Sequence, residues 1–322
     1  MGRVIVWRVT QNCNMKCRFC SYSTEVERVR GSADDTEAER LCGVFGDYKR
    51  QTGTDMLVSW IGGEPFLWKN IIPFSEMLHG YGINVSTTTN GLLLDRIELQ
   101  RSVVDCFSEV VFSLDGFEDC NDIVRQQYGH FEEVSRNIRT LAKLRDECGS
   151  DMKIKVNTIL MRRNIDRFEE FCSYLQWLGV DEVTFNQLGG FDRPEFFEEN
   201  RLTRGQVETF AERFPKVKKL FGESGLIIHG SEKYLDRILK TSRKETNPIA
   251  ECDPGAWFWF INESGFISPC SYTSYEYKLD TREIRSAEDF ARAETYFRQC
   301  RAERRSKWCD DCYCTQVYDK FE

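Results

Sequence analysis

Short runs rich in β-branched and aromatic residues alternate with amphipathic stretches of helical period from residue 3 to about residue 188. This alternation constrains the fold most, because strands joined through helices pair in parallel within one sheet. The predicted strands are Arg3–Val9, Met56–Trp60, Ile83–Thr88, Glu109–Ser113, Lys153–Ile159 and Glu182–Asn186. The predicted helices span residues 35–51, 69–80, 94–104, 131–147 and 165–178. Six strands predict an α/β fold with an open, partial (β/α)6 barrel of the TIM type rather than a closed eight-stranded barrel.

The chain contains 14 cysteines, and in a reducing compartment such a number indicates metal binding or catalysis rather than disulfides. The start MGRVIVWRVTQ lacks the layout of a signal peptide, and no stretch approaches ~20 apolar residues. We therefore expect a cytoplasmic protein that does not enter a membrane. The net charge is -8 with both signs well mixed, so we expect no nucleic-acid partner, because phosphate binding depends on clustered Lys and Arg.

Cys13, Cys17 and Cys20 lie in the loop after the first predicted strand, with Phe19 just before the last of them. Ligands collect at the carboxyl ends of strands in sheets of this kind. Three thiolates in one loop bind three irons of a 4Fe-4S cluster and leave the fourth iron open to a ligand. A zinc knuckle or buried thiols are the alternatives, but zinc sites usually pair two close-spaced ligand couples, and no second couple lies nearby.

The spacing Cys-x3-Cys-x2-Cys resembles the defining loop of the radical S-adenosylmethionine (SAM) superfamily. The resemblance implies that the open iron chelates SAM and that an injected electron cleaves SAM to a 5′-deoxyadenosyl radical. Gly62-Gly63-Glu64-Pro65, after the second strand, resembles the family's second motif, in which the carboxylate accepts from the methionine ammonium of SAM. The resemblance also implies SAM contacts from Asn90, Ser113, Asp115, Asn157 and Gln187, for each of which an ordinary turn or strand-end role is the alternative.

Six further cysteines lie near the end of the chain: Cys252, Cys270, Cys300, Cys309, Cys312 and Cys314. The β-rich runs Ala256–Ile261 and Phe266–Ser268 flank a turn sequence, which predicts a β-hairpin with Cys252 and Cys270 at its base. Cys-x12-Gly-x4-Cys followed by Cys-x2-Cys resembles the auxiliary-cluster module called a twitch domain, the short form of the SPASM domain. The resemblance implies a second 4Fe-4S cluster on Cys252, Cys270, Cys309 and Cys312. A structural zinc site is the alternative on spacing alone.

We divide the chain into a radical SAM barrel over residues 1–190, a connecting region over residues 191–249 and a twitch-like domain over residues 250–322. In the connecting region we predict a helix over residues 203–221 and a short strand over Leu226–Ile228. His229 follows that strand, and we expect a structural role for it.

The resemblance predicts an oxidoreductase or an epimerase that abstracts a hydrogen atom and receives electrons from a flavodoxin or ferredoxin. Because the first strand begins at residue 3, we expect no peptide-recognition domain before the barrel. This favours a sugar-like or aminocyclitol-like intermediate of natural-product biosynthesis over a ribosomal peptide. A dehydrogenase would pass an electron to the second cluster, whereas an epimerase would return a hydrogen atom from a thiol, for which Cys300 and Cys314 are the candidates. A non-catalytic iron-sulfur electron carrier is the alternative of another class.

Overall fold

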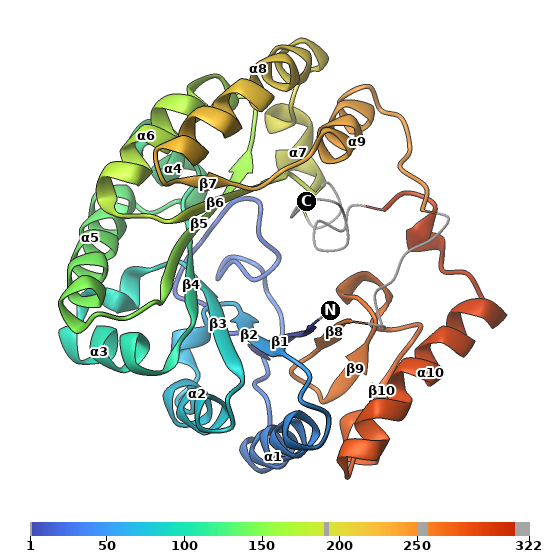
Figure 1. The fold of residues 1–322 in the computed structure, drawn as a ribbon. Helices are drawn as coiled ribbons and strands as arrows, with labels where there is room; N and C mark the ends of the chain where they lie inside the picture. The colour runs from blue at the N-terminus through green and yellow to red at the C-terminus, as the bar shows by residue number, and fades with distance from the viewer. Residues whose placement is uncertain (1, 190–192, 250–256, 313–322) are drawn as a thin grey trace.

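One sheet runs through the part of the chain described by the computed structural model, namely residues 2–189, 193–249 and 257–312. The strand order is β10-β9-β8-β1-β2-β3-β4-β5-β6-β7. The strands that pair in parallel in chain order are β1 (Arg3–Thr10), β2 (Met56–Gly62), β3 (Asn84–Thr89), β4 (Glu109–Ser113), β5 (Lys153–Leu160), β6 (Glu182–Gln187) and β7 (Ile227–Ile228). They curve around a common interior with helices outside (Figure 1), so the predicted partial barrel is confirmed.

The helices on the outside of the barrel largely follow the predicted pattern. The predicted ranges correspond to α1 (Asp35–Thr52), α2 (Ile71–Gly80), α3 (Ile97–Cys106), α5 (His130–Cys148), α6 (Phe168–Leu178) and α8 (Arg204–Glu223). The apolar pattern does not predict α4 (Glu118–Arg125), α7 (Pro194–Asn200), α9 (Glu232–Ser242) or α10 (Ala287–Glu303). For α4 the reason is that its buried face is partly polar, with Asn121, Asp122 and Arg125 all buried. None of the described helices is both long and apolar enough to cross a bilayer.

α5 illustrates how the outer helices are held. Val134, Ile138 and Leu141 recur at spacings of three and four and are fully buried. Burying each of these side chains contributes about 1.5–3 kcal/mol. The helix ends at Cys148, and the φ of 63° at the following Gly149 lies in the left-handed region that favours glycine. The packing fixes α5 along its whole length, and its first residue, His130, lies beside the end of β3.

The two faces of each barrel strand differ in character because side chains alternate along a strand. On β5, Ile154 and Val156 are fully buried in the main apolar core, between the sheet and the helices. Lys155 and Asn157 lie on the other face and bond to side chains of neighbouring strands. The interior of the barrel is therefore polar along this strand, while the apolar core lies outside it.

The C-terminal region continues the barrel sheet beyond β1. β8 (Phe258–Ile261) pairs in parallel with β1, and β9 (Phe266–Ser268) and β10 (Leu279–Asp280) follow in antiparallel order. The predicted hairpin is present, and of its two predicted strands only the first residue, Ala256, lies outside the described residues. α10 covers these strands, with Phe290 packed against Trp259 at a ring-centroid distance of 4.5 Å. Because Phe290 also contacts Phe45 of α1, the hairpin and α10 share the core of the barrel.

Candidate active site

The turn after β2 brings the cysteine loop against the sheet. Gly63 N donates to the carbonyl oxygen of Thr10 at 2.9 Å, and Glu64 N donates to that of Asn12 at 2.7 Å. A Cβ added to Gly63 would lie 2.2 Å from the carbonyl oxygen of Asn12, and one added to Gly62 would lie 2.4 Å from that of Thr10. Both glycines are therefore required for this close approach of two backbones.

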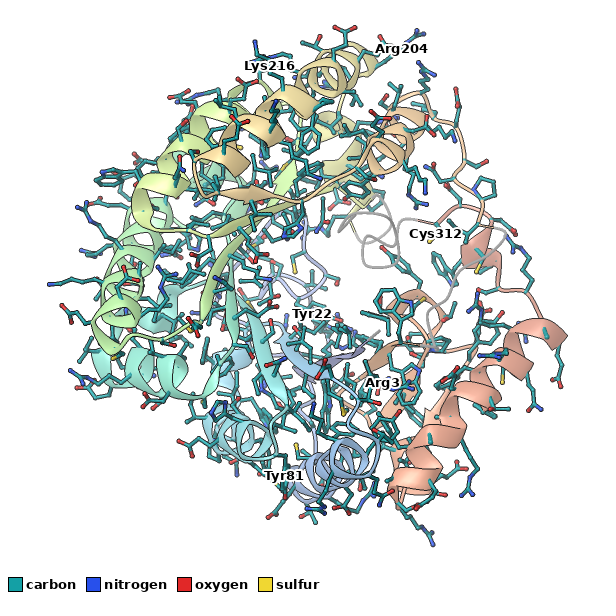
Figure 2. The ribbon with its side chains drawn as sticks, viewed as in Figure 1. Arg3, Tyr22, Tyr81, Arg204, Lys216 and Cys312 are labelled. Atoms are coloured by element: carbon teal, nitrogen blue, oxygen red, sulfur yellow. The ribbon has the colours of Figure 1, made fainter. Side chains whose placement is uncertain are left out.

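A single guanidinium organises the other side of the cysteine loop. Arg30 donates to the carbonyl oxygens of Gln11, Tyr22, Ser23 and Val26 at 2.7, 2.9, 2.6 and 3.2 Å. The loop folds back on itself through these bonds, and Tyr22 lies within the ring formed by the helices (Figure 2). Sequence analysis does not reveal this role of Arg30, because nothing in its local pattern distinguishes it from a surface arginine.

The three thiols of the loop lie close enough to influence one another's ionisation. Cys17 is buried, whereas Cys13 and Cys20 are half-buried. Burial raises the pKa of Cys13 to about 11 and that of Cys17 to about 12, because desolvation disfavours a thiolate. Coordination to iron reverses this preference, since a metal-bound thiol is deprotonated. Tyr22 N donates to Cys20 Sγ at 3.3 Å, a bond of the kind that stabilises a cluster-bound sulfur.

The donor set fits a 4Fe-4S cluster better than a single ion. Within the described ranges no three His, Cys, Asp or Glu side chains are arranged to hold one metal ion. A cluster does not need such convergence, because each thiolate binds a different iron. The buried guanidinium of Arg125 lowers the pKa of Cys17. Asp115, Cys17 and Cys20 in turn raise the pKa of Arg125. A cation in this position favours a negatively charged cluster.

Phe19 and Asp115 both contact Arg125. The ring centroid of Phe19 lies 5.7 Å from the guanidinium carbon, and Phe19 also packs against a small apolar cluster that includes Phe196. Arg125 pairs with Asp115 at 2.8 Å, and the other carboxylate oxygen of Asp115 accepts from Ile159 N at 2.8 Å. Asp115 is fully buried. Its carboxylate therefore joins α4 to β5, and the contact with SAM that the resemblance implied stays a prediction.

Glu64 is fully buried and also bonds to protein groups. Its Oε1 accepts from Thr89 Oγ1 at 2.8 Å and from Phe66 N at 3.1 Å, and its Oε2 accepts from Asn90 N at 2.8 Å. Burial raises its pKa to about 7, against the lowering effect of these bonds. These bonds link the ends of β2 and β3, and the expected contact of this carboxylate with the methionine ammonium of SAM stays a prediction. Pro65 is buried at the start of the following short turn.

Asn90 and two further expected SAM contacts lie along the carboxyl edge of the sheet. Asn90 Nδ2 donates to Asn14 Oδ1 in the cysteine loop at 2.8 Å. Ser113 and Asn157 are paired in register on β4 and β5 and are half-buried. Gln187, expected near the adenine of SAM, donates to Thr241 Oγ1 of α9 at 3.1 Å. The structure thus places Asn90 next to the cysteine loop, while Gln187 holds α9 to β6.

The interior of the barrel carries a charged network that the sequence pattern does not reveal. Lys155 of β5 lies between Glu109 of β4 and Glu182 of β6, at 2.5 and 2.9 Å. His229 bonds to Glu182 at 2.7 Å, so it is part of this network rather than isolated. These bonds lower the pKa of Glu182 to about 2 despite its burial. The residues meet only because strands distant in the sequence pair side by side.

Three of the predicted auxiliary-cluster ligands lie together in the C-terminal region. The pKa of Cys309 is raised by its burial and also by Cys270 and Cys312, which places the three thiols near one another. Cys309 N and Cys312 N are held by the carbonyl oxygens of Ser306 and Asn247 at 3.0 Å each. Cys252, the fourth predicted ligand, lies outside the described residues.

Of the two predicted hydrogen donors, only Cys300 lies in the described part of the chain. Cys300 is on the last turn of α10, packs against the main apolar core and lies beside the hydroxyl of Tyr296. This core is outside the barrel interior, so Cys300 is poorly placed to meet a substrate there. Cys314 lies outside the described residues.

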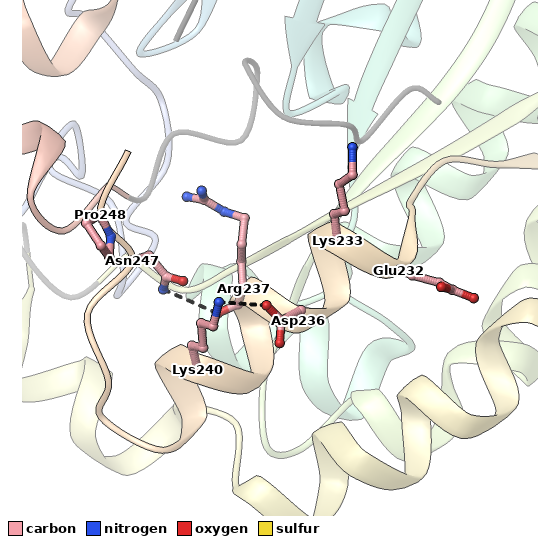
Figure 3. Close-up of a pocket in the computed structure, with 7 residues that line it drawn as sticks. All are labelled: Glu232, Lys233, Asp236, Arg237, Lys240, Asn247 and Pro248. Carbon is pink, nitrogen blue, oxygen red and sulfur yellow. Dashed lines mark hydrogen bonds and ion pairs between the residues drawn. The ribbon is translucent and has the colours of Figure 1, made fainter. Parts of the chain in front are cut away.

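A hollow of about 530 Å³ lies against α9, and Figure 3 shows its lining. Lys233, Arg237 and Lys240 contribute positive charge, and Lys240 pairs with Asp236 at 2.8 Å. Asn247 and Pro248 form its other side. None of the predicted site residues lines this hollow, so we do not assign the reaction to it.

A cysteine loop after the first strand and a glycine-glutamate turn after the second, on a partial parallel barrel, define a radical SAM protein. The family model described as the radical SAM superfamily matches residues 7–175, and the chain belongs to this superfamily. Members of this family use a 4Fe-4S cluster and SAM, and the related proteins are enzymes.

Two relatives illustrate the range of the family. The chain is 24% identical over 315 residues to the AdoMet-dependent heme synthase of Oleidesulfovibrio alaskensis, covering 93% of this chain and 76% of that protein. It is 27% identical over 216 residues to the S-adenosylmethionine-dependent nucleotide dehydratase of a Fibrobacter species, covering 60% of this chain and 59% of that protein.

Solved structures share the fold over nearly the whole chain. SuiB of Streptococcus suis bound to S-adenosylmethionine gives a TM-score of 0.67 at 15% identity, covering 100% of this chain and 76% of that chain. The enzyme anSMEcpe with bound AdoMet gives a TM-score of 0.66 at 17% identity, covering 99% and 91%. At such identities the likeness concerns the fold alone.

Proposed function

We propose that this radical SAM enzyme oxidises a small polar substrate and passes the released electron to a second iron-sulfur cluster in its C-terminal region. When bound, the first cluster and SAM supply a 5′-deoxyadenosyl radical that abstracts a hydrogen atom. The observation that carries the proposal is the presence of two separate groups of thiols, Cys13, Cys17 and Cys20 at the barrel and Cys270, Cys309 and Cys312 beyond it.

We assign the first cluster to the three cysteines of the loop and the second to Cys270, Cys309, Cys312 and the predicted Cys252. Gly62 and Gly63 shape the approach to the loop, and Asn90, Ser113 and Asn157 are the proposed polar contacts for SAM. Glu64, Asp115 and Gln187 remain proposed contacts for SAM, and the carboxylates of Glu64 and Asp115 also hold strand ends in place. The domain boundaries at residues 190 and 250 remain predictions.

The position of Cys300 argues against one of the two candidate hydrogen donors of an epimerase, while Cys314, the other candidate, lies outside the described residues. An epimerase returns a hydrogen atom to the substrate, and a thiol that does so must face the substrate. Cys300 instead packs in the core beside Tyr296. In an oxidation the carbinol carbon loses one hydrogen atom, and the hydroxyl then loses one proton while one electron leaves as the C=O bond forms. A cluster with four protein ligands is suited to accept that electron.

The polar barrel interior supports a polar small molecule as the substrate. Asn157 of β5, with Thr184 and Asn186 of β6, presents amide and hydroxyl groups there, which suit hydroxyl and amino groups better than an apolar surface. Modification of a peptide is the alternative, because solved complexes of SuiB and anSMEcpe, which share this fold, contain peptides. A flavodoxin or ferredoxin remains the proposed reductant and the cytoplasm the proposed location.

The test begins with SAM cleavage by anaerobically reconstituted protein, which we expect to hold about eight irons in two clusters. Deoxyadenosine formation would separate an enzyme from a simple electron carrier. A panel of polar alcohols, aminocyclitols, peptides and a tetrapyrrole would then be incubated with the enzyme in deuterated water. Loss of two hydrogens from the product supports oxidation, whereas unchanged connectivity with deuterium incorporated supports epimerisation. Stoichiometric zinc in anaerobically purified protein would overturn the second cluster.

A further inference from the structure

His130 is a fully buried histidine at the first turn of α5, and no sequence motif marks it. Its pKa is lowered to about 3, mainly by desolvation and further by the nearby charge of Arg125. The ring is therefore neutral, so one of its nitrogens donates a hydrogen bond while the other accepts one.

The two partners of His130 determine which nitrogen carries the proton. Nε2 lies 3.0 Å from the carbonyl oxygen of Asn90, which can only accept, so Nε2 is the donor. Nδ1 lies 2.8 Å from Asn121 Nδ2 and accepts from it. Asn121 Nδ2 also donates to Asp122 Oδ1 at 3.0 Å, so both of its hydrogens are used. The geometry thus permits only one tautomer of the ring.

These bonds hold the backbone of Asn90 from two sides. Its N–H donates to Glu64 Oε2 at 2.8 Å, and its carbonyl oxygen accepts from His130. With the backbone held in this way, the side chain of Asn90 extends to Asn14 in the cysteine loop, at 2.8 Å. Any loosening of the Asn90 peptide would change the distance between the end of β3 and the cysteine loop.

The same group of bonds reaches the end of β4. Asn121 Oδ1 accepts from Asp115 N at 3.1 Å, and Asp115 pairs with Arg125 beside Cys17. Asp122 in turn accepts from Gly129 N and Phe131 N at 2.6 and 2.9 Å and so fixes the start of α5. His130 therefore connects the ends of two strands that both border the cysteine loop.

We propose that His130 is a positioning residue for SAM, which sets the place of Asn90 and of the strand ends by its two hydrogen bonds without touching SAM itself. The inference rests on the proposed SAM site. A buried, fully paired polar group of this kind favours one geometry, because any displacement leaves groups unpaired in a medium of low polarity.

The test compares two variants of the reconstituted enzyme with a matched control. His130→Leu removes both bonds at similar size, and we expect it to raise the Kd for SAM by about tenfold or more. His130→Gln retains a donor and an acceptor and should recover most of the affinity. His79→Leu, which changes an exposed histidine on α2, should bind SAM like the wild type. The change that SAM produces in the EPR spectrum of the reduced first cluster should weaken in His130→Leu only.

A second readout uses the apo-protein and needs no cluster. Amide hydrogen exchange in the peptide around Asn90 should accelerate in His130→Leu and remain unchanged in His79→Leu. Unchanged SAM affinity in a folded His130→Leu variant would overturn the inference. If that variant does not fold, the Kd for SAM is measured for His130→Asn, whose shorter amide cannot reach both partners. A Kd equal to that of His130→Gln would then refute the positioning role.

Asn90→Ala separates failure of this inference from failure of the proposed site. If Asn90→Ala leaves SAM affinity unchanged, the proposed SAM site is wrong. If Asn90→Ala weakens binding while His130→Leu does not, only the role of His130 is wrong.

Discussion

The two groups of cysteines differ in how the chain brings them together. Cys13, Cys17 and Cys20 lie in one loop whose backbone is bonded to the turn after β2. Cys270 ends a hairpin, whereas Cys309 and Cys312 follow α10. Ligands that are close in the sequence can be arranged by backbone hydrogen bonds alone. Ligands that are far apart in the sequence come together only when the intervening chain is ordered. The comparison indicates that the first site depends on local geometry and the second on the folding of the whole region.

The largest expected effect is on the first site. Replacing Cys13, Cys17 and Cys20 by Ala should remove about four irons and abolish SAM cleavage, because no ligand of the open-iron cluster remains. The barrel should keep its thermal stability, since backbone bonds rather than iron hold the loop. Iron analysis, a deoxyadenosine assay and circular dichroism melting provide the measurements. Persistent deoxyadenosine formation would refute the assignment of the first cluster.

The matching change in the second site should have a different outcome. Cys309→Ala combined with Cys312→Ala should also remove about four irons, but here the metal contributes to folding. We expect increased proteolysis of the region after residue 257, continued SAM cleavage and little oxidised product. Peptide mapping after brief protease treatment and product analysis test this. If the region resists the protease as well as in the wild type, its folding does not depend on the cluster. The proposed difference between the two sites would then be wrong.

The buried carboxylate at the first site should make the stability of the apo-protein depend on pH. The pKa of Glu64 is raised from 4.5 to about 7 in the folded protein, so the folded state binds its proton more tightly than the unfolded state does. Its contribution to stability is therefore complete below about pH 4.5 and is lost as the pH rises to about 7, a change of about 3 kcal/mol. Urea unfolding of wild type and Glu64→Gln at several pH values should show a flatter dependence in the variant. Parallel curves would contradict this explanation.

The smallest expected effect concerns the link between the two regions. Glu263, in the hairpin turn, accepts from Arg8 Nε at 2.6 Å and from Gln11 Nε2 at 2.7 Å, which ties the hairpin to the start of the cysteine loop. Glu263→Gln removes the charge opposite Arg8 and should cost about 1–2 kcal/mol of stability.

Loss of the EPR signal of the first cluster to a chelator should therefore be several times faster in Glu263→Gln than in the wild type, and its response to SAM distinguishes this cluster from the second one. The matched control is Asp280→Asn, since Asp280 pairs with the exposed Arg282 on the same region. Equal release rates in the two variants would show that the hairpin does not stabilise the loop.

The amino-acid sequence was most informative where a pattern depends on neighbouring residues. Strand and helix periodicity predicts the barrel, and Cys-x3-Cys-x2-Cys identifies the loop that meets the glycine turn. The pattern does not predict α4, because Asn121, Asp122 and Arg125 give its buried face a polar character. Nor does it show that His229 pairs with Glu182, which lies on a different strand.

By itself, the sequence determined the family, the barrel strands with most of the helices between them, and the cysteines available for iron, because these follow from residue type and short-range spacing. Only the tertiary structure decided that Glu64 and Asp115 bond to protein groups, that Cys300 packs in the core, and that His130 contacts Asn90. Hydrogen bonds between strand ends depend on which strands are neighbours in the sheet and on how closely helices pack against them. The physical reason is that burial and pairing are properties of the whole fold, whereas periodicity is a property of a segment.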